Sequence, residues 1–226
     1  MSIYYQDEHA TLHHGDALDI LPDLGDGSAA AMILDPPYST VPNSVRGRDD
    51  GAAGTSGAPM RLLTESTRHA RRILREGGIA AILCDWRRVP DISYLTTLTG
   101  LRLATSVAWT RTTIGTGGLF RGAWDPVLIA SNGAPDAVDR AGIPNVIQAN
   151  PPSRRIHPYE KPPALWRHIL QRIPRGLVVD PFAGSGASAE AANGLGFTWV
   201  GIEIDEAHCE KIARRLEGRS ERLELI

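Results

Sequence analysis

The segment AAAMILDPPY, residues 29–38, consists of six apolar residues followed by a carboxylate, two prolines and an aromatic ring. An apolar run of this length that stops at prolines indicates a parallel strand buried on both faces, because proline cannot donate to a sheet ladder and restricts the residue before it. Ligands of open α/β sheets bind at the carboxyl ends of such strands. Asp35 and the residues after it are therefore expected to open into a site.

Asp35, Pro36, Pro37 and Tyr38 together suit the recognition of a planar amine. The Asp35 carboxylate and the Pro36 carbonyl can accept the two hydrogens of an exocyclic amino group, and Tyr38 can stack on the ring that bears it. For these four residues alone, an ordinary strand-to-loop turn with a stacking tyrosine stays an alternative.

A second apolar strand is predicted over 177–180, and it leads into the glycine-rich turn PFAGSG at 181–186. Gly184 and Gly186 let a ligand approach the backbone. The helix predicted over 187–193 supplies free N–H groups at its start. The pattern is typical of a nucleotide-binding turn.

The acidic residue Glu203 lies in the next predicted strand, 198–204, nineteen residues after Gly184. Nucleotide folds place a carboxylate at this spacing against ribose hydroxyls. Ala189 stands where a dinucleotide fold has its third glycine, so adenosine without pyrophosphate is the better ligand hypothesis.

The remaining periodicity predicts an α/β chain with a strand-helix-strand unit, in which a helix over 60–75 connects the strand at 29–34 to a parallel strand at 79–84. Asp16 follows a short predicted strand and is well placed to cap a helix. Further strands are expected over 11–14, 104–110 and 127–130, the last two as a hairpin, and further helices over 17–24, 93–101, 164–172 and 207–216.

Several long stretches lack periodicity. Residues 39–59 are rich in small and polar residues, and we interpret them as a lid or as a disordered excursion. The stretches 112–125 and 132–155, on either side of the strand predicted at 127–130, are mildly basic. The candidates for phosphate contacts in and beside these stretches, for which a solvated loop is the alternative, are Arg111, Arg121, Arg140, Arg154 and Arg155.

Composition sets broad limits on the function. The 226 residues carry a net charge of -2, so a nucleic-acid surface would have to be local. The two cysteines have neither a disulfide nor a metal-site spacing, which favours a reducing compartment and no metal. No stretch approaches the ~18 apolar residues of a membrane span, and the polar start does not look like a signal peptide. We expect a cytoplasmic protein with a single domain over 1–226.

Four motifs occur in this order: DPPY at 35–38, HPxxKP at 157–162, DPFxGSG at 180–186 and GIEID at 201–205. Together they resemble the S-adenosylmethionine-dependent amino methyltransferases that modify DNA, and their order is similar to the β class. The resemblance spans most of the chain, from Gly15 to about Leu216.

The resemblance implies a Rossmann-like class I methyltransferase fold, α/β, with a mixed seven-stranded sheet and helices on both faces. Circular permutation would have moved the strand at 11–14 to the N-terminus. The catalytic half would cover about 11–133 and the cofactor half about 157–217. Target-recognition loops are expected at about 39–59 and 112–156, because no separate recognition domain is present.

Site residues follow from the resemblance motif by motif. The target base is assigned to Asp35, Pro36, Pro37 and Tyr38. S-adenosylmethionine is assigned to Phe182, Gly184, Ser185 and Gly186 in the turn, Glu203 at the ribose, Asp180 at the methionine amino group, Asp16 at the adenine end, and His157 and Lys161 at the methionine carboxylate, with Asp35 bordering it. Ala187 departs from the threonine that the family often has, so a hydroxyl contact is in doubt.

The activity that the resemblance implies is methylation of the N6 amine of adenine in DNA. N4-cytosine methylation is the alternative, although serine in place of Asp35 is commoner in those enzymes. A catalytically silent nucleic-acid-binding subunit is a further alternative, but such a subunit would be expected to have lost motif residues. A homodimer and a cognate restriction endonuclease are partners that the resemblance leaves open.

Overall fold

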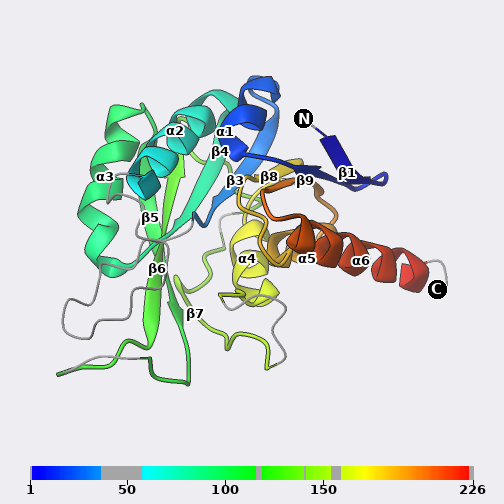
Figure 1. Ribbon diagram of the computed structural model, residues 1–226. Helices are drawn as coiled ribbons and strands as arrows, with labels where there is room; N and C mark the ends of the chain where they lie inside the picture. Colours follow the sequence, from blue (N-terminus) through cyan, green and yellow to red (C-terminus); the bar gives the residue numbers. More distant parts are fainter. Residues whose placement is uncertain (1, 37–57, 116–118, 140, 154–158, 224–226) are drawn as a thin grey trace.

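A computed structural model describes residues 2–36, 58–115, 119–139, 141–153 and 159–223. Across these ranges nine strands form one sheet in the order β1-β2-β9-β8-β3-β4-β6-β5-β7 (Figure 1). The strands are β1 (Ser2–Gln6), β2 (Ala10–His14), β3 (Ala29–Leu34), β4 (Leu74–Leu83), β5 (Arg102–Thr110), β6 (Trp124–Ser131), β7 (Val146–Gln148), β8 (Leu177–Asp180) and β9 (Thr198–Glu203). Pro37, Tyr38, His157 and nearly all of the loop predicted at 39–59 lie outside the described residues.

The sheet is mixed, as predicted. Strands β2, β9, β8, β3 and β4 are parallel, β6 is antiparallel to β4, and the predicted β5–β6 hairpin is confirmed. The strand number was predicted too low: β1 adds an antiparallel strand beside β2, and β7 adds a parallel one beside β5. Both are short edge strands with exposed residues, so neither has the apolar pattern that identifies a buried strand.

Helices cover both faces of the sheet, which confirms the predicted layering (Figure 1). Apolar residues of α1 (Ala17–Ile20), α2 (Ala58–Ile73) and α3 (Val89–Leu98) pack on one face, and those of α4 (Pro163–Leu170), α5 (Ala187–Gly194) and α6 (Glu206–Leu223) pack on the other. Two 3₁₀ turns, η1 (Leu21–Asp23) and η2 (Trp86–Arg88), complete the described elements. Within the described ranges, no helix combines the length and apolar character needed to span a membrane.

Strand β3 lies at the centre of the sheet, and all six of its residues are buried. It pairs in parallel with β4 on one side and with β8 on the other. The pairing with β4 begins at Leu74, which lies opposite Ala29, so the strand starts inside the helix predicted over 60–75. Because β8 and β9 run parallel to β3, the carboxyl ends of all three strands lie at one edge of the sheet.

The packing of β9 depends on a missing side chain at Gly201. Trp199, two residues earlier on the same face, is buried, and its indole covers the position that a Cβ of residue 201 would take. Glycine is therefore required at position 201 because the Trp199 indole leaves no room for a Cβ. The backbone conformation does not require glycine there, since Gly201 has no positive φ. The indole in turn reaches Ser188 in α5 through a hydrogen bond of 3.1 Å.

We predict that Gly201→Ala lowers the free energy of unfolding by about 1–3 kcal/mol, because the methyl group forces the Trp199 indole out of its packed position. Gly142→Ala is the matched control, since no atom lies within 4 Å of its added Cβ. Chemical unfolding of both variants measures the difference. Equal stability of the two would show that the indole relocates without cost.

Candidate active site

The carboxylate that follows β3 is held in an ion pair. Lys161 Nζ lies 2.7 Å from Asp35 Oδ2, and the two side chains are only 16% and 17% exposed. Lys161 comes directly before Pro162, the N-cap of α4. The pair therefore brings together two sequence motifs that are far apart along the chain, and screening by solvent is limited. Pro36, which follows Asp35 in the sequence, is buried.

The carboxylate that ends β8 is buried in a hydrogen-bond network. Asp180 Oδ1 accepts from the Phe182 N–H at 2.9 Å, and Oδ2 accepts from the Ser188 hydroxyl, which itself accepts from the Trp199 indole. Burial raises the pKa of Asp180 from 3.8 to about 7, against the lowering effect of these hydrogen bonds. The nearby charges of Asp35 and Glu203 contribute to this raised pKa, but less than burial does.

The carboxylate that ends β9 accepts from the glycine turn. Glu203 Oε2 accepts from the Gly184 N–H at 2.7 Å, and Oε1 accepts from the Asp205 N–H at 2.9 Å. Gly184 and Gly186 have φ values of 53° and 74°, in the left-handed region that favours glycine. At Gly186 a Cβ would also lie 3.2 Å from Ile212. Glycine is therefore favoured at position 186 both by the backbone conformation and by the limited space.

Asp16 lies at the same edge, because β2 pairs with β9 so that His14 lies opposite Glu203. The predicted N-cap is confirmed: the Asp16 carboxylate accepts from the Leu18 N–H at 2.8 Å at the start of α1. The role that the resemblance gives Asp16 at the adenine end stays a prediction.

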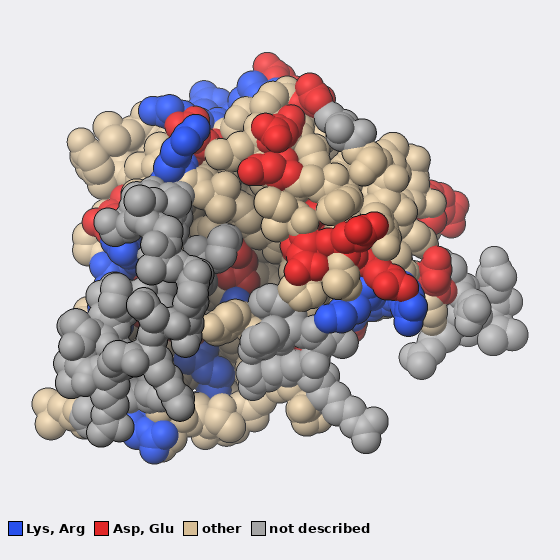
Figure 2. All heavy atoms as spheres, viewed as in Figure 1, with Lys and Arg blue, Asp and Glu red and all other residues tan. Residues whose placement is uncertain are grey.

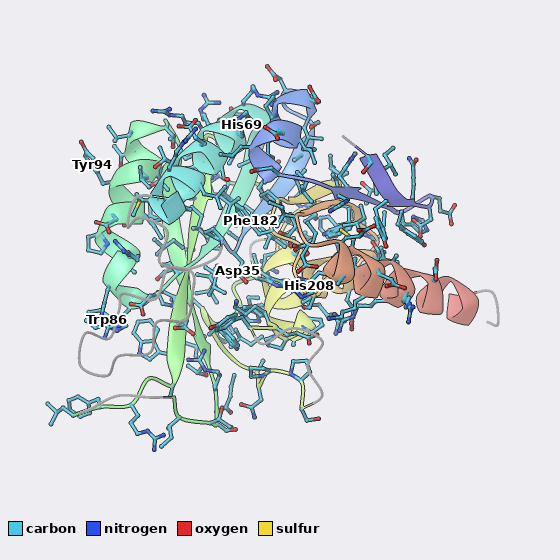
Figure 3. The ribbon with its side chains drawn as sticks, viewed as in Figure 1. Asp35, His69, Trp86, Tyr94, Phe182 and His208 are labelled. Carbon is cyan, nitrogen blue, oxygen red and sulfur yellow. The ribbon has the colours of Figure 1, made fainter. Side chains whose placement is uncertain are left out.

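The structure thus brings Asp16, Asp35, Pro36, Lys161, Asp180, Glu203 and the glycine turn to one edge of the sheet. In Figure 3, Asp35, Phe182 and His208 all lie in the central part of the molecule, whereas Trp86 and Tyr94 lie at its periphery. Phe182 packs beside the buried cluster of α1, α2 and α3, and Ser185 is buried in the turn. The positions of Pro37, Tyr38 and His157 stay predictions, because these residues are not described.

Residues 139–215 match the DNA methylase family N6_N4_Mtase. The match covers the HPxxKP segment, the glycine turn and Glu203, and it confirms the resemblance to the DNA amino methyltransferases that the motifs indicated. Membership of the β class stays a prediction.

Known proteins of similar sequence and structure include DNA methyltransferases. The DNA adenine methyltransferase YhdJ of Escherichia coli (strain K12) is 24% identical over 254 residues, with 94% of this chain and 84% of YhdJ covered. The M1.HpyAVI–SAM complex superposes with a TM-score of 0.72 and 20% identity, covering 92% of this chain and 98% of that one. The cytosine-N4-specific PvuII DNA methyltransferase superposes with a TM-score of 0.75 and 17% identity, covering 94% and 88%. The predicted class I methyltransferase fold is confirmed.

Sequence reasoning missed four residues that support the DNA methylase motifs. Ser188 and Trp199 hold Asp180. Arg215 donates to the Ser185 carbonyl and pairs with Glu160, which is buried. A serine two residues after GSG was a usable signal, because a hydroxyl in the first turn of a helix lies close to the preceding strand end. The other three depend on tertiary packing.

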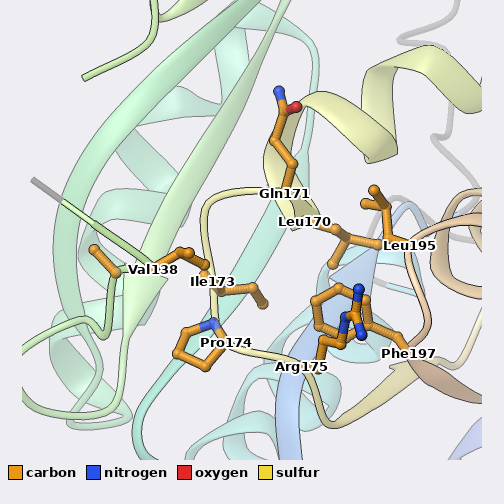
Figure 4. Close-up of a pocket in the computed structure, with 9 residues that line it drawn as sticks. Val138, Leu170, Gln171, Ile173, Pro174, Arg175, Leu195 and Phe197 are labelled. Atoms are coloured by element: carbon orange, nitrogen blue, oxygen red, sulfur yellow. The ribbon is translucent and has the colours of Figure 1, made fainter. Parts of the chain in front are cut away.

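A hollow of about 440 Å³ lies away from this site (Figure 4). It is lined by the end of α4 and by the residues that lead into β8 and β9, among them Leu170, Ile173, Pro174, Leu195 and Phe197. These are the amino ends of the strands, whereas the motif residues follow the carboxyl ends. Within the described ranges, no group of three or more His, Cys, Asp or Glu residues could hold a metal ion.

The arginines proposed for phosphate contacts are only partly free to make them. Arg111 lies 2.5 Å from Asp125 and stacks over the Trp109 ring, and Arg121 donates to the Gly115 carbonyl at 2.7 Å. The side chains of Arg140, Arg154 and Arg155 lie outside the described residues.

On the viewed face, acidic side chains gather over the beginning of α6 (Figure 2), where Asp205, Glu206 and Glu210 are exposed. A polyanion is repelled there.

We predict that the stability of the protein falls, relative to Asp180→Asn, as the pH rises from about 4 to about 7. The folded chain holds the Asp180 proton up to a pKa of about 7, whereas the unfolded chain releases it near 3.8, so in this window only the folded state carries the proton. Unfolding free energies of both proteins at pH 4.5, 6 and 8 measure the difference. Parallel pH profiles would contradict the raised pKa.

Proposed function

We propose that this chain is an S-adenosylmethionine-dependent DNA methyltransferase that methylates the exocyclic N6 of adenine in a flipped-out base. The observation that carries the proposal is the contact of Lys161, from the HPxxKP motif, with Asp35, from the DPPY motif, at the edge of the sheet where Glu203 holds the glycine turn. The order of the motifs in the sequence does not reveal that Lys161 and Asp35 are in contact; the structure does.

The chemistry of the site fits the cofactor. S-adenosylmethionine carries a positive sulfonium and a positive ammonium group, and three carboxylates at one edge favour a cation. In our assignment Asp180 receives the ammonium, Glu203 accepts from the ribose hydroxyls, and Lys161 with His157 receives the methionine carboxylate. Asp16 lies at the adenine end, and Gly184 and Gly186 let the ligand approach the backbone.

The transfer itself requires positioning of a weak nucleophile. An exocyclic amine is conjugated to its aromatic ring, and acceptance of its hydrogens by Asp35 and the Pro36 carbonyl directs the nitrogen lone pair towards the sulfonium methyl. The N–C bond forms while the C–S bond breaks, sulfur keeps the electron pair, and the nitrogen proton leaves to Asp35. Because the amine is paired within a duplex, the base is flipped out, and Tyr38 replaces part of the lost stacking.

Adenine is favoured over cytosine by the aspartate at position 35, since serine is commoner there in N4-cytosine enzymes. The known proteins of similar sequence and structure include both specificities. Incubation of duplex DNA with the protein and labelled cofactor, followed by digestion to nucleosides and mass spectrometry, tests the choice. Detection of N6-methyladenine supports the proposal. Detection of N4-methylcytosine shows that cytosine is the target base instead of adenine. If no labelled nucleoside is found with any duplex, the result supports a catalytically silent subunit.

We predict that Asp35→Ala lowers the single-turnover rate of methyl transfer by about two orders of magnitude or more, because a preorganised acceptor for the amine is lost. The melting temperature should fall modestly, since Lys161 loses its partner in a largely buried position. Rates are therefore normalised to folded protein.

The matched control is Asp85→Ala, which removes the carboxylate that follows the neighbouring strand β4. Asp85 accepts from the Arg87 N–H at the start of η2, so its loss should cost about 1 kcal/mol of stability without slowing the transfer. A rate for Asp35→Ala near that of Asp85→Ala would refute the mechanism.

The DNA surface is proposed to include the loop of the β5–β6 hairpin. Since β5 runs parallel to β4, this loop leaves the same edge of the sheet as Asp35. Leu119 and Phe120 in the loop are 91% and 86% exposed, which is unusual for side chains of this size. Apolar side chains of this kind insert between base steps in proteins that distort DNA. A wedge at this position would fill the stack as the target base leaves it.

We predict that the double variant Leu119→Ser/Phe120→Ser binds duplex DNA at least about tenfold more weakly, because the apolar contact with the bases is lost. Its stability and cofactor affinity should not change, since both side chains are exposed. Tyr94→Ser/Leu98→Ser is the control, because these side chains on α3 are 65% and 63% exposed. Fluorescence anisotropy with a labelled duplex compares the two. Equal affinity would remove the hairpin loop from the DNA surface.

A further inference from the structure

Arg215 on α6 contacts the glycine turn, the helix α5 that follows it, and the segment before α4, all of them around the candidate cofactor site. Arg215 Nη1 donates to the Ser185 carbonyl at 2.6 Å, Nη2 lies 3.2 Å from Glu160 Oε1, and Nε lies 3.3 Å from Glu190 Oε2. The Arg215 side chain is 24% exposed, and that of Glu160 is 2% exposed. The guanidinium is therefore a largely enclosed junction.

Each contact leads to a part of the site. Ser185 lies between the two glycines of the turn, and Glu160 directly precedes Lys161, the partner of Asp35. Glu190 belongs to α5, the helix that begins after the turn, and it also lies 4.0 Å from Arg167 in α4. The planar guanidinium can donate in several directions at once, which a lysine ammonium at the end of a flexible stem cannot do in the same geometry.

We propose that Arg215 is a positioning residue for the cofactor: it fixes the glycine turn through the Ser185 carbonyl and fixes Lys161 through Glu160. The inference rests on the proposed function, and it adds a residue outside every sequence motif. The three Arg215 contacts are to a backbone carbonyl and to two carboxylates of the protein. Its effect on the ligand passes through the turn and through the segment before α4.

The physical reason is preorganisation. The turn and the Glu160–Lys161 segment belong to different parts of the chain, and a ligand that contacts both must find them at a fixed separation. Loss of Arg215 removes this cation from the buried Glu160 carboxylate and the contact between the segment and α6, so the segment is held less firmly in place. The ligand then has to order the segment on binding, which weakens its affinity.

The experiment compares Arg215→Met and Arg215→Lys with Arg214→Met. Arg214 is the neighbouring residue on α6, 74% exposed, and its pair with Glu210 is a surface contact one helical turn away. Cofactor affinity is measured by calorimetry with S-adenosylmethionine and corrected for the folded fraction, and kcat and KM are measured for methyl transfer to DNA.

Arg214→Met should bind the cofactor like the wild type. For Arg215→Met we expect an affinity at least about tenfold lower, with KM for the cofactor raised more than kcat is lowered, since positioning acts on binding. Arg215→Lys should recover part of the affinity. Glu160→Gln, which keeps the shape of the side chain, should weaken binding less, because it changes only one of the three Arg215 contacts. In combination with Arg215→Met the losses should be less than additive, because both substitutions remove the contact between Arg215 and Glu160.

Unchanged affinity in folded Arg215→Met overturns the inference, and so does full rescue by lysine, which would reduce the role to one of charge. If Arg215→Met fails to fold, Arg215→Lys and Glu160→Gln decide by the same criterion. Gly184→Val separates the two hypotheses: if it abolishes binding while Arg215→Met does not, the proposed site stands without Arg215. A wild-type protein that binds no S-adenosylmethionine overturns the proposed function instead.

Discussion

Burial of Asp180 beside the carboxylates of Asp35 and Glu203 is the constraint around which the candidate site is built. The strand order β9-β8-β3 brings these three carboxylates to one edge of the sheet, where burial raises the pKa of Asp180 and the charges of Asp35 and Glu203 add to this effect. Each carboxylate is compensated differently. Asp35 has the Lys161 ammonium, Asp180 has a hydroxyl and a backbone N–H, and Glu203 has two backbone N–H groups. Parallel strands with free carboxyl ends cannot avoid the crowding, so the surrounding residues must supply the donors.

The compensating groups differ in how readily a ligand can replace them. The donors to Asp180 and Glu203 are backbone N–H groups and the hydroxyl of the buried Ser188, all of which are held by the fold. Lys161 is different, because its ammonium, which pairs with Asp35, is carried on a flexible stem. In the proposed assignment, the carboxylates with donors fixed by the fold face the cofactor, and the pair of Lys161 and Asp35 lies between the cofactor and the target base.

Much of the fold could be predicted from the sequence, because buried strands and amphipathic helices leave periodic signals. The bounds predicted for β3 are those observed, and Asp16 caps a helix as expected. The edge strands β1 and β7 were missed because each is stabilised by one neighbour and not by burial of its own side chains. Arg215 could not be identified either, since a charged residue in a helix with alternating Glu and Arg looks like part of a solvated face. Only packing reveals which of two adjacent arginines, 214 or 215, points inward.

The ion pair of Asp35 and Lys161 has a consequence for the order of the proposed reaction. Asp35 Oδ2 lies 2.7 Å from the ammonium of Lys161. A neutral amine makes weaker hydrogen bonds to a carboxylate than an ammonium does, so a flipped base cannot displace Lys161 unless the ammonium gains another anion. The carboxylate of the methionine moiety is such an anion. Cofactor binding would then draw Lys161 away and leave Asp35 free for the amine, so that the base becomes tightly held only when a methyl donor is already present.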